Sequence, residues 1–535
     1  MKCARKAAMP GIIIAGAGVG GLMTAFALKS KLGYDDFVIY EKATDVGGTW
    51  RDNIYPGAAS DINVHFYSHS ADLNPEWDTT VAGQADMHVY WQKLTAKYGI
   101  YPNISFGREV VSAEWEADTE QYTVISRDVA TGETSEATAK VFISAIGVLN
   151  VPRYPNIPGL SSFKGLQFHS ARWDAGADLA GKRVAVIGNG ASSVQFMPFI
   201  SKDQSVQVTQ FCRTPHYIFP SIKSEYSAAW KWCLRNIPGL IRAYRHFLYF
   251  DAEVRYALVF ASSFLRKYVT RPIPVGYMKS SIPAKYLDKM IPEYSLGCKR
   301  LLFDVAYMDT LHRPNVELNW DGVQTITEDG IITKTGEVMP FDVIIYATGF
   351  QADKYPLNIV NDKGVTIQDY FNANGGPQAY LGMGSPGFPN MFYIGGPNTY
   401  TGHTSVIHTE ELQITYLLKM LPYILSGEVS SFEPSLKATE DYNDVVQSRM
   451  NRSSYVSCDS WYRAGGDGKV TATFPGPMLL YWWWVRHIKW SDWVAKANNQ
   501  RKWDRSVRWG TIGRALNPFS YAMAAGGKVL AWLSV

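Results

Sequence analysis

Short apolar runs alternate with helical patterns along most of the chain. Residues 11–15 form an apolar run that predicts a buried strand, and residues 22–28 follow it with helical spacing. A second apolar run covers residues 37–40, and the same order begins again at residue 183. Buried strands that alternate with helices are typical of parallel α/β sheets. The pattern therefore predicts two units of this kind.

A glycine-rich turn follows the first strand. Gly16, Gly18 and Gly21 stand in G-x-G-x-x-G spacing before the predicted helix. Such glycines allow a tight turn and a close approach of a pyrophosphate, to which the helix N-terminus offers unpaired N–H groups. Glu41 ends the next strand, at the interval expected for a carboxylate that binds a ribose. Strand, glycines, helix and acid together predict a dinucleotide site.

A second, weaker copy of the motif follows the apolar run at residues 183–187. Gly188 and Gly190 keep the first two glycines, whereas Ser193 replaces the third. The next strand, residues 206–211, leads into Arg213 and Thr214, where an NAD site would carry an acid. An arginine and a hydroxyl can bind the 2'-phosphate of NADPH, although a surface arginine at a strand end is the simpler alternative. We predict an NADPH site.

Two dinucleotide motifs in one chain are typical of flavoproteins that pair FAD with a nicotinamide cofactor. The apolar run at residues 343–350 is expected to return the chain to the first sheet. Aromatic and basic residues at helical spacing predict a helical insertion at about residues 222–290. The predicted fold is α/β with two Rossmann-like domains: an FAD domain formed by residues 1–150 and 341–500, an NADP domain over residues 151–340 that contains the insertion, and a C-terminal extension over residues 501–535.

Composition and charge narrow the range of partners. The chain has 535 residues, a net charge of only +4 and no long basic run. Nucleic-acid binding is not expected, because such proteins concentrate Lys and Arg on one face. No apolar stretch reaches the roughly 18 residues that a membrane-spanning helix needs. Two or more globular domains with a small-molecule substrate remain.

The cysteines argue against a disulfide framework. Their number is odd and none stands in C-x-x-C spacing: Cys3, Cys212, Cys233, Cys298 and Cys458. We therefore expect a reducing, cytoplasmic compartment and no redox-active cysteine pair beside the flavin. O2 or another acceptor is left as the partner of the reduced flavin.

Two further motifs lie outside the glycine turns. One comprises Gly47, Gly48, Thr49, Trp50, Tyr55, Pro56, Gly57 and Asp61, and the other comprises Phe163, Gly165, His169, Trp173 and Asp174. With both motifs present, the chain resembles the type I Baeyer-Villiger monooxygenases over about residues 10–493. The resemblance implies an FAD enzyme that uses NADPH and O2 to convert a ketone to an ester or lactone through an anionic C4a-peroxyflavin.

The resemblance also implies roles for single residues. It places Gly48, Thr49 and Trp50 in a loop beside the flavin, with no helix or strand expected between Gly47 and Asp61. It implies that Arg300 stabilises the peroxyflavin anion and that Asp61 orients Arg300, which suits a charge that localises during the reaction. Lys299 would join Arg213 and Thr214 at the 2'-phosphate. The alternatives are a turn aspartate at Asp61 and a solvated Lys-Arg pair.

Three further segments carry weaker predictions. The resemblance implies a hinge at His169 and Trp173, although a buried interdomain histidine explains the same position. It also implies that Trp461 lies on a mobile loop that contacts NADPH and substrate. Gly395 and Gly396, before a helix expected at about residues 405–421, resemble the last FAD segment of the family.

The C-terminal extension leaves two alternatives open. A largely apolar stretch occupies residues 519–535. Before it, basic residues interleave with tryptophans: Arg501, Lys502, Trp503, Arg505, Arg508, Trp509 and Arg514. The extension either rests on a membrane as a weak peripheral contact or folds back on the FAD domain.

For the whole protein, an N- or S-oxygenating flavin monooxygenase and a non-catalytic dinucleotide sensor are the rival functions.

Overall fold

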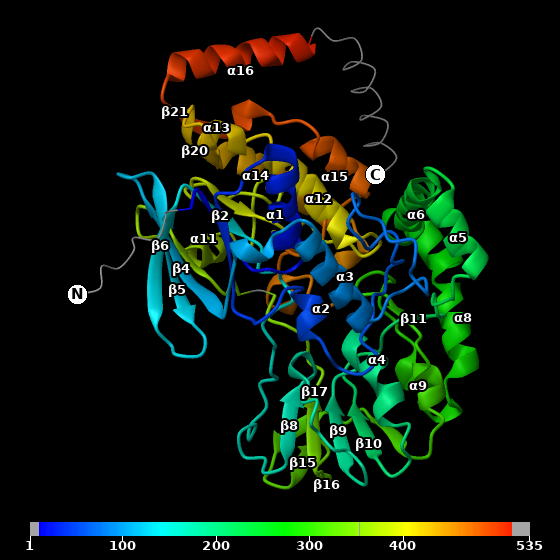
Figure 1. The fold of residues 1–535 in the computed structure, drawn as a ribbon. Helices are drawn as coiled ribbons and strands as arrows, with labels where there is room; N and C mark the ends of the chain where they lie inside the picture. The colour runs from blue at the N-terminus through cyan, green and yellow to red at the C-terminus, as the bar shows by residue number, and fades with distance from the viewer. Residues whose placement is uncertain (1–9, 353, 516–535) are drawn as a thin grey trace.

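The computed structural model describes residues 10–352 and 354–515 as two parallel sheets with their covering helices and a helical flank (Figure 1). The first sheet has the order β19-β7-β1-β2-β3, and every neighbouring pair is parallel. Its strands are β1 (Ile12–Ala15), β2 (Phe37–Glu41), β3 (Ile104–Phe106), β7 (Val141–Ser144) and β19 (Met391–Tyr393). All residues of β1 and β7 are buried, as the continuous apolar run predicts for β1.

Helices and a smaller sheet cover the two faces of the first sheet. On one face α1 (Val19–Leu32) packs against α3 (Gln84–Lys97) and α12 (Val406–Leu417). On the other face lies a four-stranded sheet of order β18-β4-β5-β6, whose buried rings share a core with Ile13 and Phe142. Its strands are β4 (Arg108–Glu116), β5 (Gln121–Asp128), β6 (Thr134–Ala139) and β18 (Asn358–Val360).

The second sheet has the order β13-β10-β9-β17-β8 and is also parallel throughout. Its strands are β8 (Leu166–His169), β9 (Arg183–Ile187), β10 (Gln207–Phe211), β13 (Val316–Asn319) and β17 (Val343–Tyr346). Helix α4 (Ala191–Ile200) follows β9 as predicted. A three-stranded antiparallel sheet closes the other face: β14 (Val323–Ile326), β15 (Gly330–Thr333) and β16 (Val338–Pro340).

The strand at residues 343–346 does not return the chain to the first sheet, and that expectation is wrong. β17 pairs with β9 through Val343 and Val184, and with β8 on its other side. The first sheet is instead completed by β19, which pairs with β7. A fully apolar run indicates a buried parallel strand but does not indicate which sheet buries it. The boundary predicted at residue 340 therefore cuts off a central strand of the second sheet.

The predicted helical insertion forms one flank of the molecule (Figure 1). Its helices are α5 (Ala228–Asn236), α6 (Leu240–Tyr256), α7 (Ser263–Leu265), α8 (Pro272–Ser281) and α9 (Leu287–Met290), with π-helical turns η3 (Ala257–Ala261) and η4 (Arg266–Thr270) between them. The Ser227 hydroxyl accepts a hydrogen bond from Trp230 N and starts α5. Breaks between these helices divide the insertion into short elements, which lie beside both sheets.

The C-terminal segments pack on the first sheet's side of the molecule. They comprise α13 (Leu421–Leu425), β20 (Val429–Pro434), α14 (Leu436–Met450), α15 (Met478–Val485), β21 (Trp493–Ala497) and α16 (Gln500–Ala515). Trp503 of α16 is buried against the rings of Tyr423, Phe432 and Trp490 at 5.1 to 5.5 Å. This contact agrees with the alternative in which the extension folds back. The side chains of Arg508, Trp509 and Arg514, and all of residues 516–535, lie outside the described residues.

Over the part of the chain that the structure describes, no helix is both long enough and apolar enough to cross a membrane.

Candidate active site

The first glycine turn brings two backbone segments into direct contact. Gly16 has a φ of +100°, and Gly18 is the N-cap of α1. Gly48 has a φ of +52°, and a Cβ on it would lie 2.8 Å from the Cα of Gly18. A Cβ on Gly21 would lie 2.0 Å from Gly16 O. Only glycine fits at Gly16, Gly21 and Gly48, and the N–H groups at the start of α1 can meet a pyrophosphate.

Glu41 ends β2 beside this turn, as predicted. Its carboxylate accepts hydrogen bonds from Ala17 N at 2.7 Å and from Ala43 N at 2.9 Å. Burial raises the pKa of Glu41 more than these two bonds lower it. The carboxylate therefore stiffens the turn that would hold the cofactor, in addition to lying at the ribose position.

The segment between Gly47 and Asp61 is not entirely a loop, which corrects that expectation. Residues Thr49–Asp52 form the short helix α2, whose Arg51 N and Asp52 N donate to Gly48 O. A single turn fits because the nearest proline, Pro56, comes after the helix ends. Trp50 of α2 is buried, with its ring 5.7 Å from that of Tyr67. The helix thus directs Trp50 inward.

The second glycine turn is more open than the first. Gly188 has a φ of +116°, and a Cβ on it would lie 2.4 Å from Ala347 O. No described atom lies within 4 Å of a Cβ placed on Gly190. Ser193, which replaces the third glycine, donates its hydroxyl to Gly190 O at 2.9 Å. The serine closes the turn without blocking the space in front of α4.

Cationic side chains gather beside this second turn. Asn189 Nδ2 donates to Thr214 O at 2.8 Å and ties the turn to the end of β10. Burial and the charge of Arg213 lower the pKa of Lys299. Burial, Lys299 and Arg213 together lower the pKa of His216 to about 3. The effect of Arg213 on Lys299 indicates that these two predicted residues lie close together. A bound 2'-phosphate would neutralise the repulsion between the two cations.

Arg300 and Asp61, 239 residues apart in the chain, form an ion pair. Arg300 donates from Nε at 2.9 Å and from Nη2 at 2.5 Å to the same oxygen, Oδ2 of Asp61. Nη1 also donates to Thr401 O at 3.4 Å. Burial lowers the pKa of Arg300, but Asp61 outweighs this effect and raises the pKa above its ordinary value. Arg300 is therefore a fixed, permanent cation.

Three residues beside this pair, two of them buried and Tyr67 partly buried, were not predicted from the sequence. Burial raises the pKa of Tyr462 to about 12, and the charges of Arg300 and Asp61 both act on it. The same two charges act on Tyr67, whose pKa is also raised by burial. Burial and Arg300 lower the pKa of His403 to about 3. These neutral groups surround the ion pair and keep the site's charge on Arg300 and Asp61.

Glu410 of α12 was also not predicted. It is buried, and burial raises its pKa to about 8, with Glu411 adding to the effect. Its Oε1 lies 3.3 Å from the Cβ that Gly20 would carry and 3.2 Å from that of Gly395. Its Oε2 has no hydrogen-bond partner among the described residues. A buried acid without a partner, between α1 and the Gly395 segment, fits contact with an FAD bound there.

A disulfide joins Cys298 to Cys458, so the expectation that the cysteines form no disulfide is wrong, although the two are not a C-x-x-C pair. The two Cα atoms are 6.1 Å apart although 160 residues separate them, a proximity that spacing along the chain cannot reveal. The bond ties the Lys299–Arg300 segment to the loop that carries Trp461. On that loop Trp461 contacts the ring of Tyr462 at 4.5 Å. Tyr462, rather than Trp461, is the residue placed against Arg300.

His169 and Trp173 lie at the edge of the second sheet. His169 is buried at the end of β8, and its Nδ1 accepts a hydrogen bond from Ala171 N at 3.0 Å. Burial lowers the pKa of His169 to about 4. The ring of Trp173 packs at 5.1 Å from Phe168 and 5.3 Å from Phe196. Both are packed side chains, and a hinge role for them stays a prediction.

Two cavities adjoin these residues. One has a volume of about 440 Å³ and is lined by Asp61, by Ala191 and Gln195 of α4, and by the segment 302–305. It connects the ion pair with the start of α4. The other has a volume of about 710 Å³ and is lined by residues after β7 and after β19, including Gly395 and Tyr400. Space is therefore present beside both glycine turns.

Known proteins with similar sequences are flavin monooxygenases. The model of the family described as "Pyridine nucleotide-disulphide oxidoreductase" matches residues 13–216. A Baeyer-Villiger monooxygenase of Pseudomonas aeruginosa is 35% identical over 471 residues, covering 87% of each chain. One of Streptomyces coelicolor is 34% identical over 479 residues, covering 87% of this chain and 88% of the relative. The FAD-binding monooxygenase ktnD of Aspergillus niger is 33% identical over 509 residues, 91% of this chain and 82% of its own.

Solved structures with the same fold hold NADP⁺ in one case, and FAD together with NADP in another. Cyclohexanone monooxygenase from Rhodococcus sp. Phi1 bound to NADP⁺ superposes with a TM-score of 0.80 at 25% identity, covering 91% of this chain and 100% of the other. OTEMO in complex with FAD and NADP gives a TM-score of 0.80 at 26% identity, covering 91% and 99%. The similarity extends over both sheets and the segments between them.

Proposed function

Because the chain belongs to the Baeyer-Villiger monooxygenases, we propose that Arg300 and Asp61 direct its oxygen chemistry. The enzyme uses FAD, NADPH and O2 to convert a ketone to an ester or lactone. Bound FAD supplies the redox chemistry that a protein side chain cannot, taking reducing equivalents from NADPH and activating O2. The ketone and O2 are the partners that this reaction requires.

The glycine turns supply the binding part of the mechanism. The turn at Gly16, Gly18 and Gly48 offers backbone N–H groups to the FAD pyrophosphate, with Glu41 at the ribose. The turn at Gly188 and Gly190 does the same for NADPH. Arg213 and Lys299 recognise the 2'-phosphate, and Trp461 is proposed to contact the bound nicotinamide cofactor from its loop. These residues position the reactants and exclude water.

The observation that carries the proposal is the Arg300–Asp61 pair. Two N–H groups of Arg300 are fixed on one carboxylate oxygen, so the plane of the guanidinium is set before substrate arrives. A permanently charged, preoriented cation stabilises negative charge that develops on the carbonyl oxygen as the new C–O bond forms. N- or S-oxygenation develops no such charge on the substrate, so the pair favours a ketone as the acceptor.

Substitution of Arg300 tests the proposal. Arg300→Ala should lower ester formation by about 100-fold or more, in line with the loss of one charge-stabilising donor. NADPH should still bleach the flavin absorbance under anaerobic conditions, because hydride transfer does not use this charge. The rate of ester formation by Asp61→Asn should lie between those of the wild type and Arg300→Ala, because Arg300 keeps its charge but loses the carboxylate that orients it.

Arg127→Ala is the matched control, because Arg127 of β5 forms an exposed pair with Glu109 of β4. It should leave ester formation at the wild-type rate. Ester formation by Arg300→Ala at the wild-type rate would remove the catalytic assignment. Oxidation of a thioether but not of a ketone by the wild-type enzyme would favour the S-oxygenating alternative.

For the remaining segments we propose a hinge at His169 and Trp173, and a C-terminal extension that rests on the protein rather than on a membrane. The buried ring of Trp503 supports the second point. A cytoplasmic location is proposed because NADPH is consumed there, and the Cys298–Cys458 bond is the observation against it. Cell fractionation distinguishes the compartments.

A further inference from the structure

Large apolar side chains are exposed along the helical insertion. On α6 the exposed residues are Phe247, Phe250 and Val254, with exposed fractions of 62%, 65% and 41%. Their spacing of three and four residues places them on one side of the helix. We call the exposed apolar residues of this flank the insertion face: Trp232, Ile237, Phe247, Phe250, Val254, Phe264, Tyr268, Val269 and Ile273. A grouping of this kind marks a contact surface.

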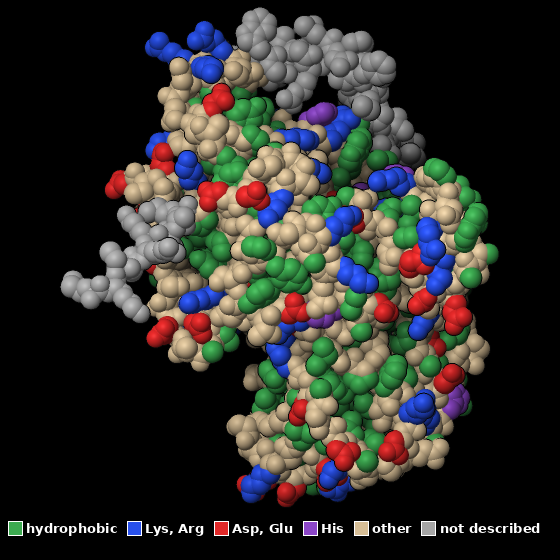
Figure 2. Space-filling model, in the orientation of Figure 1, with side chains coloured by type: hydrophobic (Ala, Val, Ile, Leu, Met, Phe, Trp, Pro, Cys, Tyr) green, Lys and Arg blue, Asp and Glu red, His purple; other side chains and the backbone are tan. Residues whose placement is uncertain are grey.

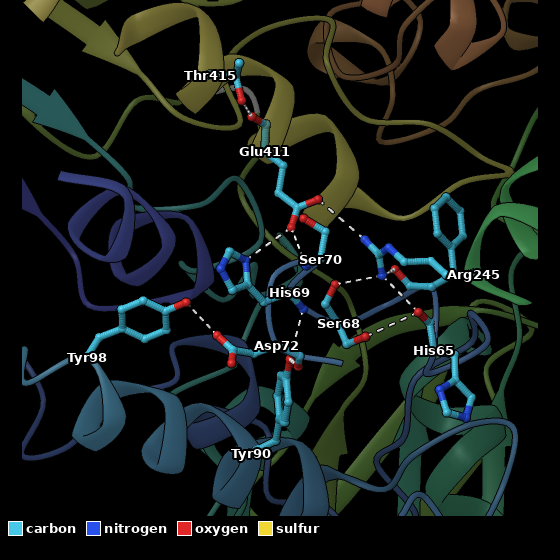
Figure 3. A network of polar contacts seen from close by, with 11 residues as sticks. His65, Ser68, His69, Ser70, Asp72, Tyr90, Tyr98, Arg245, Glu411 and Thr415 are labelled. Carbon is cyan, nitrogen blue, oxygen red and sulfur yellow. Dashed lines mark hydrogen bonds and ion pairs between the residues drawn. The ribbon is translucent and has the colours of Figure 1, made fainter. Parts of the chain in front are cut away.

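The opposite side of α6 is fastened to the first domain. Arg245 is buried, and its Nη1 donates to the backbone oxygens of His65, Phe66 and Ser68 at 2.9 to 3.0 Å (Figure 3). Its Nη2 donates to Glu411 of α12 at 3.4 Å, and Glu411 also accepts from Ser70 N. The polar network therefore fixes which side of α6 faces inward. Phe247, Phe250 and Val254 point away from it.

The same flank carries a concentrated positive charge. Residues 227–281 contain nine Lys and Arg but only two Asp and Glu, a net charge of +7 in a chain whose total is +4. Arg235 and Arg255 pair with Glu76 and Asp251. The exposed bases that stand among the exposed rings outside these pairs are Arg242, Lys267 and Lys279. Lys267, for example, lies 5.0 Å from the centre of the Tyr268 ring. Figure 2 shows hydrophobic and basic side chains intermixed on this flank.

We propose that the insertion face binds the surface of an anionic lipid bilayer. Exposed Phe, Trp and Tyr rings favour the interface between headgroups and acyl chains, while Lys and Arg on the same face attract acidic headgroups. Charge complementarity selects an anionic surface, because residues 227–281 are net positive whereas the rest of the chain is net negative. The contact is peripheral and independent of the oxygenation chemistry.

Vesicle flotation tests the proposal with the full-length, FAD-loaded enzyme. The probes are vesicles of phosphatidylcholine alone and of phosphatidylcholine with about one third phosphatidylserine, each at low and high salt. Wild-type enzyme should float with the anionic vesicles at low salt, and much less with neutral vesicles or at high salt. F247S with F250S, and separately R242E with K267E, should each reduce the bound fraction by about tenfold or more.

Control variants keep the test decisive. V129S with V338S removes two exposed apolar side chains from β-hairpin regions, with exposed fractions of 56% and 69%, and should bind vesicles like the wild type. Unchanged FAD content and NADPH oxidation rate establish that F247S with F250S is folded. Equal flotation of that variant and the wild type would overturn the proposal. Absence of vesicle binding by the wild type would also overturn the proposal, even if the wild type forms a dimer that F247S with F250S abolishes.

A truncation after residue 515 separates the insertion from the end of the chain. The truncated enzyme should float like the full-length protein. If the truncation abolishes flotation while F247S with F250S does not, the lipid contact belongs to residues 516–535 and the insertion face is not the site.

Discussion

Lys299 is the residue whose surroundings most directly predict coenzyme preference. Its ammonium group is close enough to Arg213 for that charge to lower its pKa. Lys299→Ala should raise the KM for NADPH by about 10- to 100-fold, the loss expected for one charge-assisted hydrogen bond to a phosphate. The KM for NADH should stay unchanged, because NADH lacks the 2'-phosphate.

Steady-state kinetics with both coenzymes measures this effect, and Lys285→Ala serves as the control. Lys285 is exposed and lies over the ring of Tyr286, away from any predicted phosphate contact. An equal rise of both KM values in Lys299→Ala would contradict the assignment, because it would point to a general distortion of the site.

Glu410 predicts a pH dependence of stability. Its folded-state pKa is raised to about 8, so the folded protein binds a proton there that the unfolded chain releases at lower pH. The resulting stabilisation is complete below the ordinary carboxyl pKa and is lost as the pH rises toward 8. Between about pH 5 and pH 8, wild type should lose up to about 1.4 kcal/mol per pH unit relative to Glu410→Gln.

Thermal unfolding midpoints of the two FAD-loaded proteins at several pH values measure this difference. The unfolding midpoint of Glu410→Gln should rise relative to that of the wild type as the pH increases. Parallel midpoint curves would show that Glu410 is already ionised in the folded enzyme. That result would contradict the expectation from its burial and from the lack of a described partner for Oε2.

Sequence motifs identify the residues of the site that a ligand dictates, and they miss those that the fold supplies. Glycines and the ribose acid stand at fixed spacing because a pyrophosphate requires it. Tyr462 and Tyr67, by contrast, are two of 32 tyrosines, and nothing local separates them from packing residues. Their proximity to Arg300 arises only when distant loops meet. The cysteine pair was missed for the same reason.

Among the elements, the turn that contains Gly48 is the most constrained by its backbone. Gly48→Ala should release FAD and lower the unfolding midpoint, because its Cβ would lie 2.8 Å from Gly18 Cα at a φ of +52°. Gly107→Ala is the matched control. Gly107 has a φ of +66°, but no described atom lies within 4 Å of its would-be Cβ.

FAD content after purification and the thermal midpoint distinguish the two substitutions. Gly107→Ala should keep its FAD and cost only about 1 to 2 kcal/mol of left-handed backbone strain. Full FAD occupancy in Gly48→Ala would show that the two turns can separate without loss of the cofactor.

Element types follow from the sequence more readily than element partners do. The buried strands β1, β9 and β17 were each visible as apolar runs, because a strand buried on both faces has no polar side. The assignment of β17 to the wrong sheet shows the limit of this signal. Helix α2 was missed because four residues between glycine and asparagine are too few for any period to appear.

At the scale of the whole molecule, Arg245 holds the insertion to the first domain. Burial lowers the pKa of Arg245, and the neighbouring carboxylate of Glu411 offsets that effect. Burial acts to raise the pKa of the partly exposed Glu411, but its hydrogen bond with His69 and the charge of Arg245 lower that pKa to about 2. Arg245→Met should destabilise the protein by about 3 to 5 kcal/mol, because Glu411 and three carbonyl oxygens lose a donor.

Arg242→Met is the control for this substitution, since Arg242 lies on the same helix with its side chain exposed. Limited proteolysis provides the second measurement, with earlier cleavage expected in the insertion of Arg245→Met than in that of Arg242→Met. Identical digestion patterns and midpoints would show that α6 is held by its apolar contacts alone.

The bond between Cys298 and Cys458 has a topological consequence. It closes a covalent ring that includes β17, inside the second sheet, and β19, at the edge of the first. While the ring is closed, Cys298 and Cys458 stay together in the unfolded chain, which restricts its conformations and stabilises the folded protein. Preparations kept with and without a thiol reductant are therefore two different molecules, to be told apart by nonreducing mass spectrometry before their activities are compared.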